Sequence, residues 1–138
     1  MDLKSSVQVS ATGLRAQSLR MRVIAENLAN QDSVAKTPGG DPYRRKVISF
    51  KSELDRASGV NLVKAQKPTQ DRSDFELKYD PGHPAANSDG YVKMPNVNVM
   101  VEMADMSEAN RSYEANLQMI KQARQMISMT IDLLRTSS

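Results

Sequence analysis

The residues best suited to chemistry in this chain surround its single histidine. His83 lies between Gly82 and Pro84, with Asp80 and Asp89 a few residues away on either side. Imidazole and carboxylate groups bind transition metals, so these side chains are candidates for part of a metal site. A histidine between glycine and proline more often has a structural role in a turn. We therefore expect no metal and no cofactor.

No other spacing in the sequence is typical of a catalytic site. Serine and lysine are plentiful, but they form no nucleophile elbow, no phosphate-binding glycine loop and no helical zinc motif. The absence of cysteine excludes both thiolate chemistry and disulfide bonds. We expect a protein that is not an enzyme.

The clearest basic cluster comprises Arg44, Arg45 and Lys46, with the aromatic residues Tyr43 and Phe50 nearby. A nucleic-acid-binding surface would use the basic groups for phosphates and the rings for base stacking. The alternatives are a solvated strand edge and a contact with an acidic protein surface. Short basic runs are weak signals, and the net charge of +3 is mild, so we expect no nucleic-acid partner.

The composition indicates one ordinary domain with a thin core. The chain has 138 residues, of which 39% are hydrophobic and 4% aromatic, and it has no tryptophan. No apolar run approaches the roughly 20 residues of a membrane-spanning helix, so we expect no transmembrane segment. The first residues lack the features of a cleavable secretory signal. The protein is therefore expected to stay in the cytoplasm or to leave by a route that reads another signal.

The chain divides into three segments by composition. Residues 1–32 have a helical pattern without proline, and residues 97–138 contain a second predicted helix from Val99 to Leu134, with Asn98 as its N-cap. The middle segment, residues 33–96, carries all six prolines and five of the six glycines. Its predicted strands lie at residues 46–51, 75–79 and 90–94. We expect a terminal-helix domain of residues 1–32 and 97–138, and a middle extension containing a small β-hairpin element.

Each predicted helix carries an apolar stripe with seven-residue spacing. Such spacing is typical of helices that pack side by side, so we expect the two ends of the chain to meet each other or other copies. The residues of this expected seam are Val7, Leu14, Met21, Leu28, Met106, Tyr113, Ile120, Ile127 and Leu134.

Each helix also has a second apolar series on another face. The first helix carries Val9, Ala16 and Val23, and the second carries Met119, Met126 and Leu133. A helical hairpin alone would leave these faces in water, which indicates a second partner. The alternative is that the chain's own middle segment covers them. We favour contacts between subunits, because the middle segment has few apolar groups to offer.

Several motifs resemble those of a known family. Residues 13–18 and 20–30, which end in Asn27-Leu28-Ala29-Asn30, resemble the N-terminal signature shared by rod, hook and hook-associated proteins of the bacterial flagellum. Further matches to the proximal-rod members lie at residues 38–45, 79–84, 90–97 and 108–116. Residues 55–76 match no family pattern.

This resemblance implies a fold, a location and partners. It implies a mainly α protein whose terminal helices pair as an antiparallel coiled coil, with an outer β-containing extension. Proteins of this family leave the cytoplasm through the flagellar type III export apparatus without a cleaved signal. They polymerise in the periplasm, with copies of themselves and neighbouring rod proteins, into the hollow proximal rod of the basal body. This rod transmits torque from motor to hook.

Within such a rod, polar side chains on the helices are expected to set the register between subunits. Loss of their hydrogen bonds would leave buried donors unpaired. The residues in question are Asn27, Asn30, Asn110, Arg111 and Asn116. The alternative function is that of a cytoplasmic coiled-coil adaptor or chaperone, which would bind partner helices and fold as a small oligomer.

Overall fold

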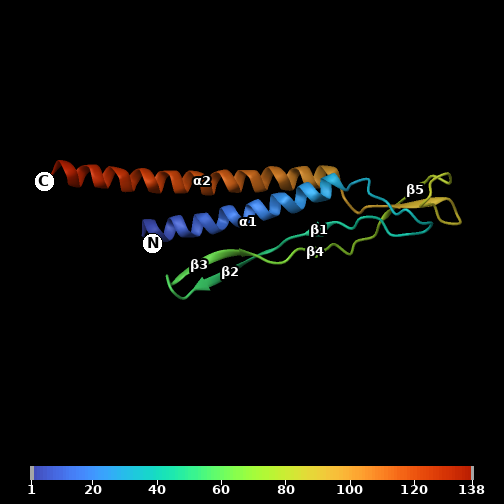
Figure 1. Cartoon of the computed structure of the whole chain (residues 1–138), viewed down its shortest axis with the longest axis horizontal. Helices are drawn as coiled ribbons and strands as arrows, with labels where there is room; N and C mark the ends of the chain where they lie inside the picture. Colours follow the sequence, from blue (N-terminus) through green and yellow to red (C-terminus); the bar gives the residue numbers. More distant parts are fainter. Residues whose placement is uncertain (1, 138) are drawn as a thin grey trace. The chain divides into compact units, whose positions relative to one another are not determined.

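Two long helices contain most of the regular structure in the computed structural model, which describes residues 2–137 (Figure 1). Helix α1 runs Leu3–Ala29 and helix α2 runs Val99–Thr136, which confirms both predicted helices. The predicted N-cap is also confirmed, because the Asn98 side chain accepts hydrogen bonds from the backbone N–H groups of Met100 and Val101 at 3.0 and 3.3 Å. Neither helix is long and apolar enough to cross a membrane.

The strands form three separate two-stranded antiparallel sheets. Strand β1 (Lys46–Val47) pairs with β4 (Thr69–Gln70), β2 (Phe50–Asp55) pairs with β3 (Val60–Ala65), and β5 (Glu76–Tyr79) pairs with β6 (Tyr91–Met94). The three predicted strand regions are confirmed, although the first is divided between β1 and β2. Strands β3 and β4 were not predicted.

The predicted mainly α class is wrong. Of residues 2–137, 48% are helical and 18% lie in strands, and the structure there has three sheets in place of the single expected hairpin element. The two unpredicted strands lack the regular alternation by which strands are predicted from sequence, because both residues of β4 are exposed and two adjacent residues of β3, Leu62 and Val63, are half-buried. They exist because each one pairs with a specific partner strand, and local composition does not reveal that pairing.

The β2–β3 turn shows how a segment without a recognised pattern becomes ordered. Gly59 has a φ of 70°, which favours glycine, and its N–H group donates to the carbonyl of Asp55 at 2.7 Å. The Asp55 side chain accepts from the Ser58 hydroxyl at 2.6 Å and from the Ala57 N–H at 3.3 Å. Short-range hydrogen bonds of this kind stabilise turns. They fix the register in which Asp55 lies opposite Val60.

The chain folds as two compact units, and each contains part of both helices. The described part of unit 1 comprises residues 2–20, 50–66 and 108–137, and unit 2 comprises residues 21–49 and 67–107. Unit 1 therefore contains the β2–β3 hairpin, and unit 2 contains the other two sheets. The expected division into a terminal-helix domain and a middle extension stays a prediction.

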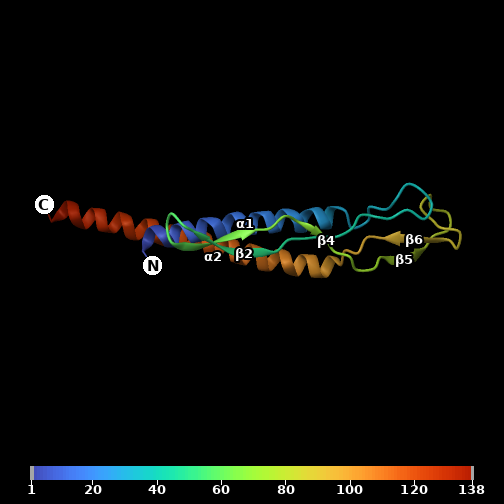
Figure 2. The same ribbon diagram turned by 90° about the horizontal axis from the view of Figure 1, so that it is seen from below.

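In unit 1, α1 lies between α2 and the β2–β3 hairpin (Figures 1 and 2). The two helices are antiparallel here, since Arg20 pairs with Glu108 at 3.5 Å and Gly13 lies against Asn116. A Cβ atom added at Gly13 would lie 2.8 Å from the Asn116 amide nitrogen, so only glycine permits this approach without a shift. On the hairpin side, the Thr12 hydroxyl accepts from the Val63 N–H at 3.2 Å.

The core of unit 2 combines apolar and polar side chains. Val23 and Ile24 of α1 are buried, as is Val92 of β6. Asn27 and Glu102 are buried as well, with exposures of 1% and 0%. Burying polar groups is costly unless they are hydrogen-bonded. The candidate functional site is therefore built from the hydrogen-bonding partners of these two side chains.

Candidate functional site

The Asn27 amide uses its full hydrogen-bonding capacity within one copy of the chain. Its oxygen accepts from the Tyr43 hydroxyl at 2.7 Å and from the Lys46 N–H at 2.9 Å. Its nitrogen donates to the Lys46 carbonyl at 2.8 Å and to Glu102 at 3.3 Å. An amide side chain offers two donors and two acceptor positions. Because it bonds both the N–H and the carbonyl of Lys46, as the backbone of a neighbouring strand would, Asn27 links β1 to α1. Its bond to Glu102 adds the link to α2.

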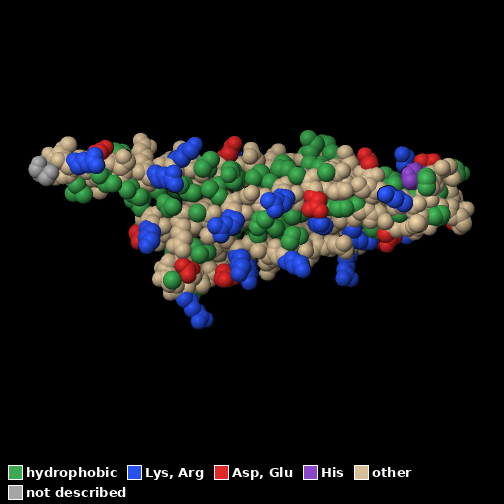
Figure 3. All heavy atoms as spheres, in the orientation of Figure 1, with side chains coloured by type: hydrophobic (Ala, Val, Ile, Leu, Met, Phe, Trp, Pro, Cys, Tyr) green, Lys and Arg blue, Asp and Glu red, His purple; other side chains and the backbone are tan. Residues whose placement is uncertain are grey.

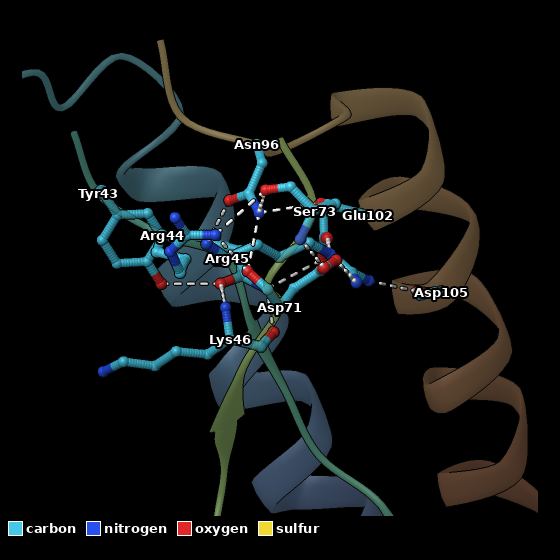
Figure 4. A network of polar contacts seen from close by, with 10 residues as sticks. Tyr43, Arg44, Arg45, Lys46, Asp71, Ser73, Asn96, Glu102 and Asp105 are labelled. Carbon is cyan, nitrogen blue, oxygen red and sulfur yellow. Dashed lines mark hydrogen bonds and ion pairs between the residues drawn. The ribbon is translucent and has the colours of Figure 1, made fainter. Parts of the chain in front are cut away.

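Arg45, the residue immediately before β1, connects this part of the chain to α2 (Figure 4). Its Nε group donates to Glu102, and its two terminal nitrogens lie 3.2 Å from Asp71 and 3.6 Å from Asp105. Burial lowers the pKa of Arg45, but the bonds to Glu102 and Asp71 outweigh this and raise it above the usual value. The fork geometry of guanidinium suits several carboxylates at once. Because Glu102 is fully buried, Arg45 supplies the charge that makes its burial tolerable.

Asp71 and Asn96 extend the network to a second strand segment. The Asn96 side chain accepts from the Arg45 N–H at 2.7 Å and donates to the Asp71 carbonyl at 3.0 Å. A hydrogen bond from the Ser73 N–H, helped by Arg45, lowers the pKa of the Asp71 carboxyl below its usual value. Arg44 lies 4.2 Å from the centre of the Phe75 ring and donates to the Asp71 carbonyl. The network thus joins three separate stretches of chain.

The basic cluster makes its observed contacts within the chain. Arg44 and Arg45 are engaged with carbonyl and carboxylate oxygens of the same chain, and Lys46 contacts Glu26 at 2.6 Å. The cluster therefore resembles the expected contact with an acidic protein surface, except that the surface belongs to the chain itself. Its partners Asp71, Asn96 and Glu102 were not predicted from the sequence. Only the Asp-x-Ser spacing at Asp71 gave a local signal, that of a turn.

His83 has a structural contact in the turn. Its Nδ1 atom accepts from the Ala85 N–H at 2.9 Å. Across residues 2–137 no group of three or more histidine, aspartate or glutamate side chains is arranged to hold a metal ion.

The structure places most of the predicted seam residues at intermediate exposure. Those with intermediate exposure are Val7, Leu14, Met21, Leu28, Met106, Tyr113 and Ile120. Ile127 and Leu134 are exposed, at 41% and 66%. Small residues supply the buried positions of the two helices in unit 1, among them Ala16, Ala109 and Ala123. The seam assignment stays a prediction.

The predicted subunit-interface residues divide into covered and exposed groups. Ala16, Val23 and Asn27 are buried in a single copy, and Val9, Asn30 and Asn116 have intermediate exposure. Asn110, Arg111, Met119, Met126 and Leu133 are exposed. For Asn27 the observed hydrogen bonds are all within the chain, so it sets internal register in this structure. The exposed α2 residues are the ones free to contact a neighbour.

The C-terminal part of α2 is the least covered region of the described chain. We call residues 124–136 the α2 overhang; every one of them is exposed. Because Gly13 lies opposite Asn116 in an antiparallel pair, the first residue of α1 reaches only about as far as Met126. Figure 3 shows hydrophobic side chains along this free part of α2. Such a surface is typical of a site of protein association.

Comparisons with known proteins identify the family to which these features belong. Residues 88–133 match the family model described as the flagellar basal body rod FlgEFG protein C-terminal. The flagellar basal-body rod protein FlgC of Agrobacterium fabrum is 56% identical over 135 residues, which cover 98% of this chain and 97% of the relative. FlgC of Bacillus subtilis is 41% identical, covering 93% and 95%, and FlgC of Salmonella typhimurium is 38% identical, covering 96% and 98%.

The chain belongs to the FlgC family of flagellar basal-body rod proteins. It is a structural rod subunit of the flagellar basal body. Because the relatives are named as rod proteins, the comparisons favour a structural role in the rod over the alternative of a cytoplasmic adaptor or chaperone.

Proposed function

We propose that this rod subunit polymerises in the periplasm, with copies of itself and neighbouring rod proteins, into the hollow proximal rod that transmits torque from motor to hook. It reaches the periplasm through the flagellar type III export apparatus. The observation that carries this proposal is the exposed apolar surface of α2, which includes Met119, Met126 and Leu133 at 50%, 54% and 69% exposure. Their burial between subunits would hold the polymer together.

The polar network of unit 2 supports a mechanical role. Torque applied to a subunit loads the junctions between its helices and its strand segments. Asn27 and Arg45 tie β1 to both helices through hydrogen bonds and ion pairs, and Asn96 adds the segment that contains Asp71. Several bonds that must break together resist shear better than one. The network would thus keep the unit rigid under load.

A triple substitution tests the assembly role of the exposed apolar surface. Changing Met119, Met126 and Leu133 to glutamine removes that surface without altering a buried residue. Burial of one such side chain is worth about 1.5–3 kcal/mol, so even partial loss at three positions weakens association by about a hundredfold or more. We expect loss of swimming and of rod incorporation. The measurements are motility in soft agar and the chain's presence in isolated basal bodies.

The matched control retains the apolar surface. Met119→Leu, Met126→Leu and Leu133→Met together conserve hydrophobic character and approximate volume. This variant is expected to swim normally. Normal swimming by the glutamine variant would contradict the proposed role of the surface.

A further inference from the structure

Methionine is the side chain through which a mild oxidant acts on this protein. The chain has nine methionines but no cysteine and no tryptophan. Sulfur-containing side chains are those that peroxide oxidises most readily, and here no thiol competes with the thioether of methionine. The positions of the methionines in the fold therefore decide which surface is open to oxidation.

Three of the methionines share one face of α2 in unit 1. Met119, Met126 and Met129 are 50%, 54% and 57% exposed. At about 100° per residue they fall within an arc of about 80° around the helix. Asn116, which lies against Gly13 of α1, is about 60° from the near edge of this arc and about 140° from the far edge. The three side chains, which we call the methionine face, therefore lie outside the contact with α1.

The other methionines that the structure describes lie in unit 2. Met21, Met94 and Met106 are half-buried. Met100 and Met103, at the start of α2, are exposed by 76% and 55%. The methionine face is thus the part of unit 1 that peroxide can modify, and the half-buried methionines provide an internal comparison.

Oxidation converts each thioether on this face into a sulfoxide. A lone pair of the sulfur attacks one oxygen of hydrogen peroxide, so that an S–O bond forms as the O–O bond breaks. The departing hydroxide takes the proton of the transferred oxygen and becomes water. The sulfur loses two electrons and the peroxide gains them. The sulfoxide oxygen is a polar acceptor, and burying it without a donor costs free energy that burying the thioether does not.

We propose that Met119, Met126 and Met129 are oxidised by peroxide in the unassembled chain and that their sulfoxides block its association with other subunits. This inference rests on the proposed function, in which Met119 and Met126 become buried between subunits together with Leu133. After assembly, burial keeps peroxide away from these sulfur atoms. The modification therefore acts before assembly, and methionine sulfoxide reductases reverse it by returning the sulfoxide to the thioether.

Peroxide treatment of the full chain tests which methionines react. Mass spectrometry of peptides measures the sulfoxide fraction at each methionine over time. We expect Met119, Met126 and Met129 to react at least about fivefold faster than the half-buried Met21 and Met106, because the oxidant must reach the sulfur. In isolated rods we expect the same three residues to react at least about tenfold more slowly than in the free chain. Equal rates in the free chain and in rods would overturn the proposed protection by assembly.

A leucine variant tests the effect on association. Met119→Leu, Met126→Leu and Met129→Leu together retain an apolar face without a thioether, and the variant keeps Met100 and Met103. In analytical ultracentrifugation, peroxide is expected to weaken self-association of the native chain by at least about tenfold. The same treatment is expected to change association of the leucine variant by less than about twofold.

Enzymatic reduction gives a second control on the same sample. Sulfoxide reductases for both epimers, supplied with a dithiol, are expected to restore association of the oxidised native chain to within about twofold of its original value. The dithiol has no disulfide to reduce, because the chain has no cysteine. Recovery therefore assigns the loss of association to methionine.

The outcomes separate this modification from the rod function itself. Unchanged association of the oxidised native chain would overturn the proposed block and leave the rod function intact. An equal loss in the leucine variant would overturn it as well. A native chain that does not associate before oxidation, and that is absent from isolated rods, would overturn the proposed function instead.

Discussion

Replacement of Asn27 by alanine is expected to release β1 from the two helices of unit 2. The substitution removes four hydrogen bonds, to Tyr43, to both backbone groups of Lys46 and to Glu102. At about 0.5–1.5 kcal/mol each, the four bonds together contribute at most about 6 kcal/mol to the free energy of opening. Tyr43 and Lys46 are half-buried, so water replaces part of this loss. We expect the opening free energy of the strand segment to fall by about 3 kcal/mol.

Amide hydrogen exchange measures this opening locally. The backbone N–H of Tyr43 donates to Ser33 at 2.9 Å, and that of Asp71 donates to Arg45 at 2.8 Å. Neither group bonds to the Asn27 side chain, so both report on opening of the segment rather than on the deleted contact. A fall of about 3 kcal/mol corresponds to exchange about a hundredfold faster at both positions.

The matched control is Asn30→Ala, at the other asparagine of the same motif. The Asn30 side chain donates to the Glu26 carbonyl at 2.9 Å and accepts from the Ser33 hydroxyl at 3.0 Å, so its bonds are local to the helix end. We expect exchange to change by about fivefold or less, corresponding to about 1 kcal/mol. Equal effects of the two substitutions would refute the argument that Asn27 joins separate parts of unit 2.

Other substitutions test the ion pairs and the helix contact. Arg45→Met is expected to lower the free energy of unfolding in urea by about 3–5 kcal/mol, because it leaves Glu102 buried without its cation. The double substitution Arg45→Met, Glu102→Met is expected to recover most of this free energy. A double variant as unstable as Arg45→Met would argue against the pairing. The pKa of Asp71 is lower in the folded state than in the unfolded state, so its ionised carboxylate stabilises the fold. This stabilisation is complete above the unfolded-state pKa of about 3.9 and is lost as pH falls through the folded-state pKa. Asp71→Asn is therefore expected to flatten the fall of the unfolding midpoint below about pH 4, and an unchanged acid profile would contradict this. The double variant Gly13→Ala, Asn116→Ala is expected to be about 1 kcal/mol more stable in thermal unfolding than Asn116→Ala alone. Alanine favours the helix more than glycine does, and the second substitution removes the close contact at this position. A less stable double variant would mean that a group other than Asn116 limits the approach of the two helices.

The helices were predictable because their signals are local. Seven-residue spacing, the absence of proline and the Asn98 cap all act within a few residues, and the observed bounds agree closely with those expected. The strands were only partly predictable. Strands β5 and β6 follow from composition, whereas β4 contains two exposed residues that are ordered by pairing with β1 more than twenty positions earlier. Such pairing depends on contacts between distant segments.

The candidate site shows the same division. The motif that ends in Asn30 drew attention to Asn27 as a polar residue that sets register. Its partners come from two other segments, however: Tyr43 and Lys46 from the stretch that leads into β1, and Glu102 from α2. Likewise, Arg45 was visible as part of a basic cluster, whereas its carboxylate partners on α2 and at Asp71 were not. Residue type indicates what a side chain can bind. The fold decides which partner lies within reach.

The sequence by itself determined that two long helices carry more apolar surface than one hairpin can cover, and its motifs resembled those of flagellar rod proteins. Only the tertiary structure decided which part of that surface remains free. Ala16 is covered in a single copy, while the overhang is exposed because the first residue of α1 reaches only about as far as Met126. Hydrophobic periodicity measures the tendency of a face to be buried. Whether it is buried depends on register and relative length, which are properties of the packed pair.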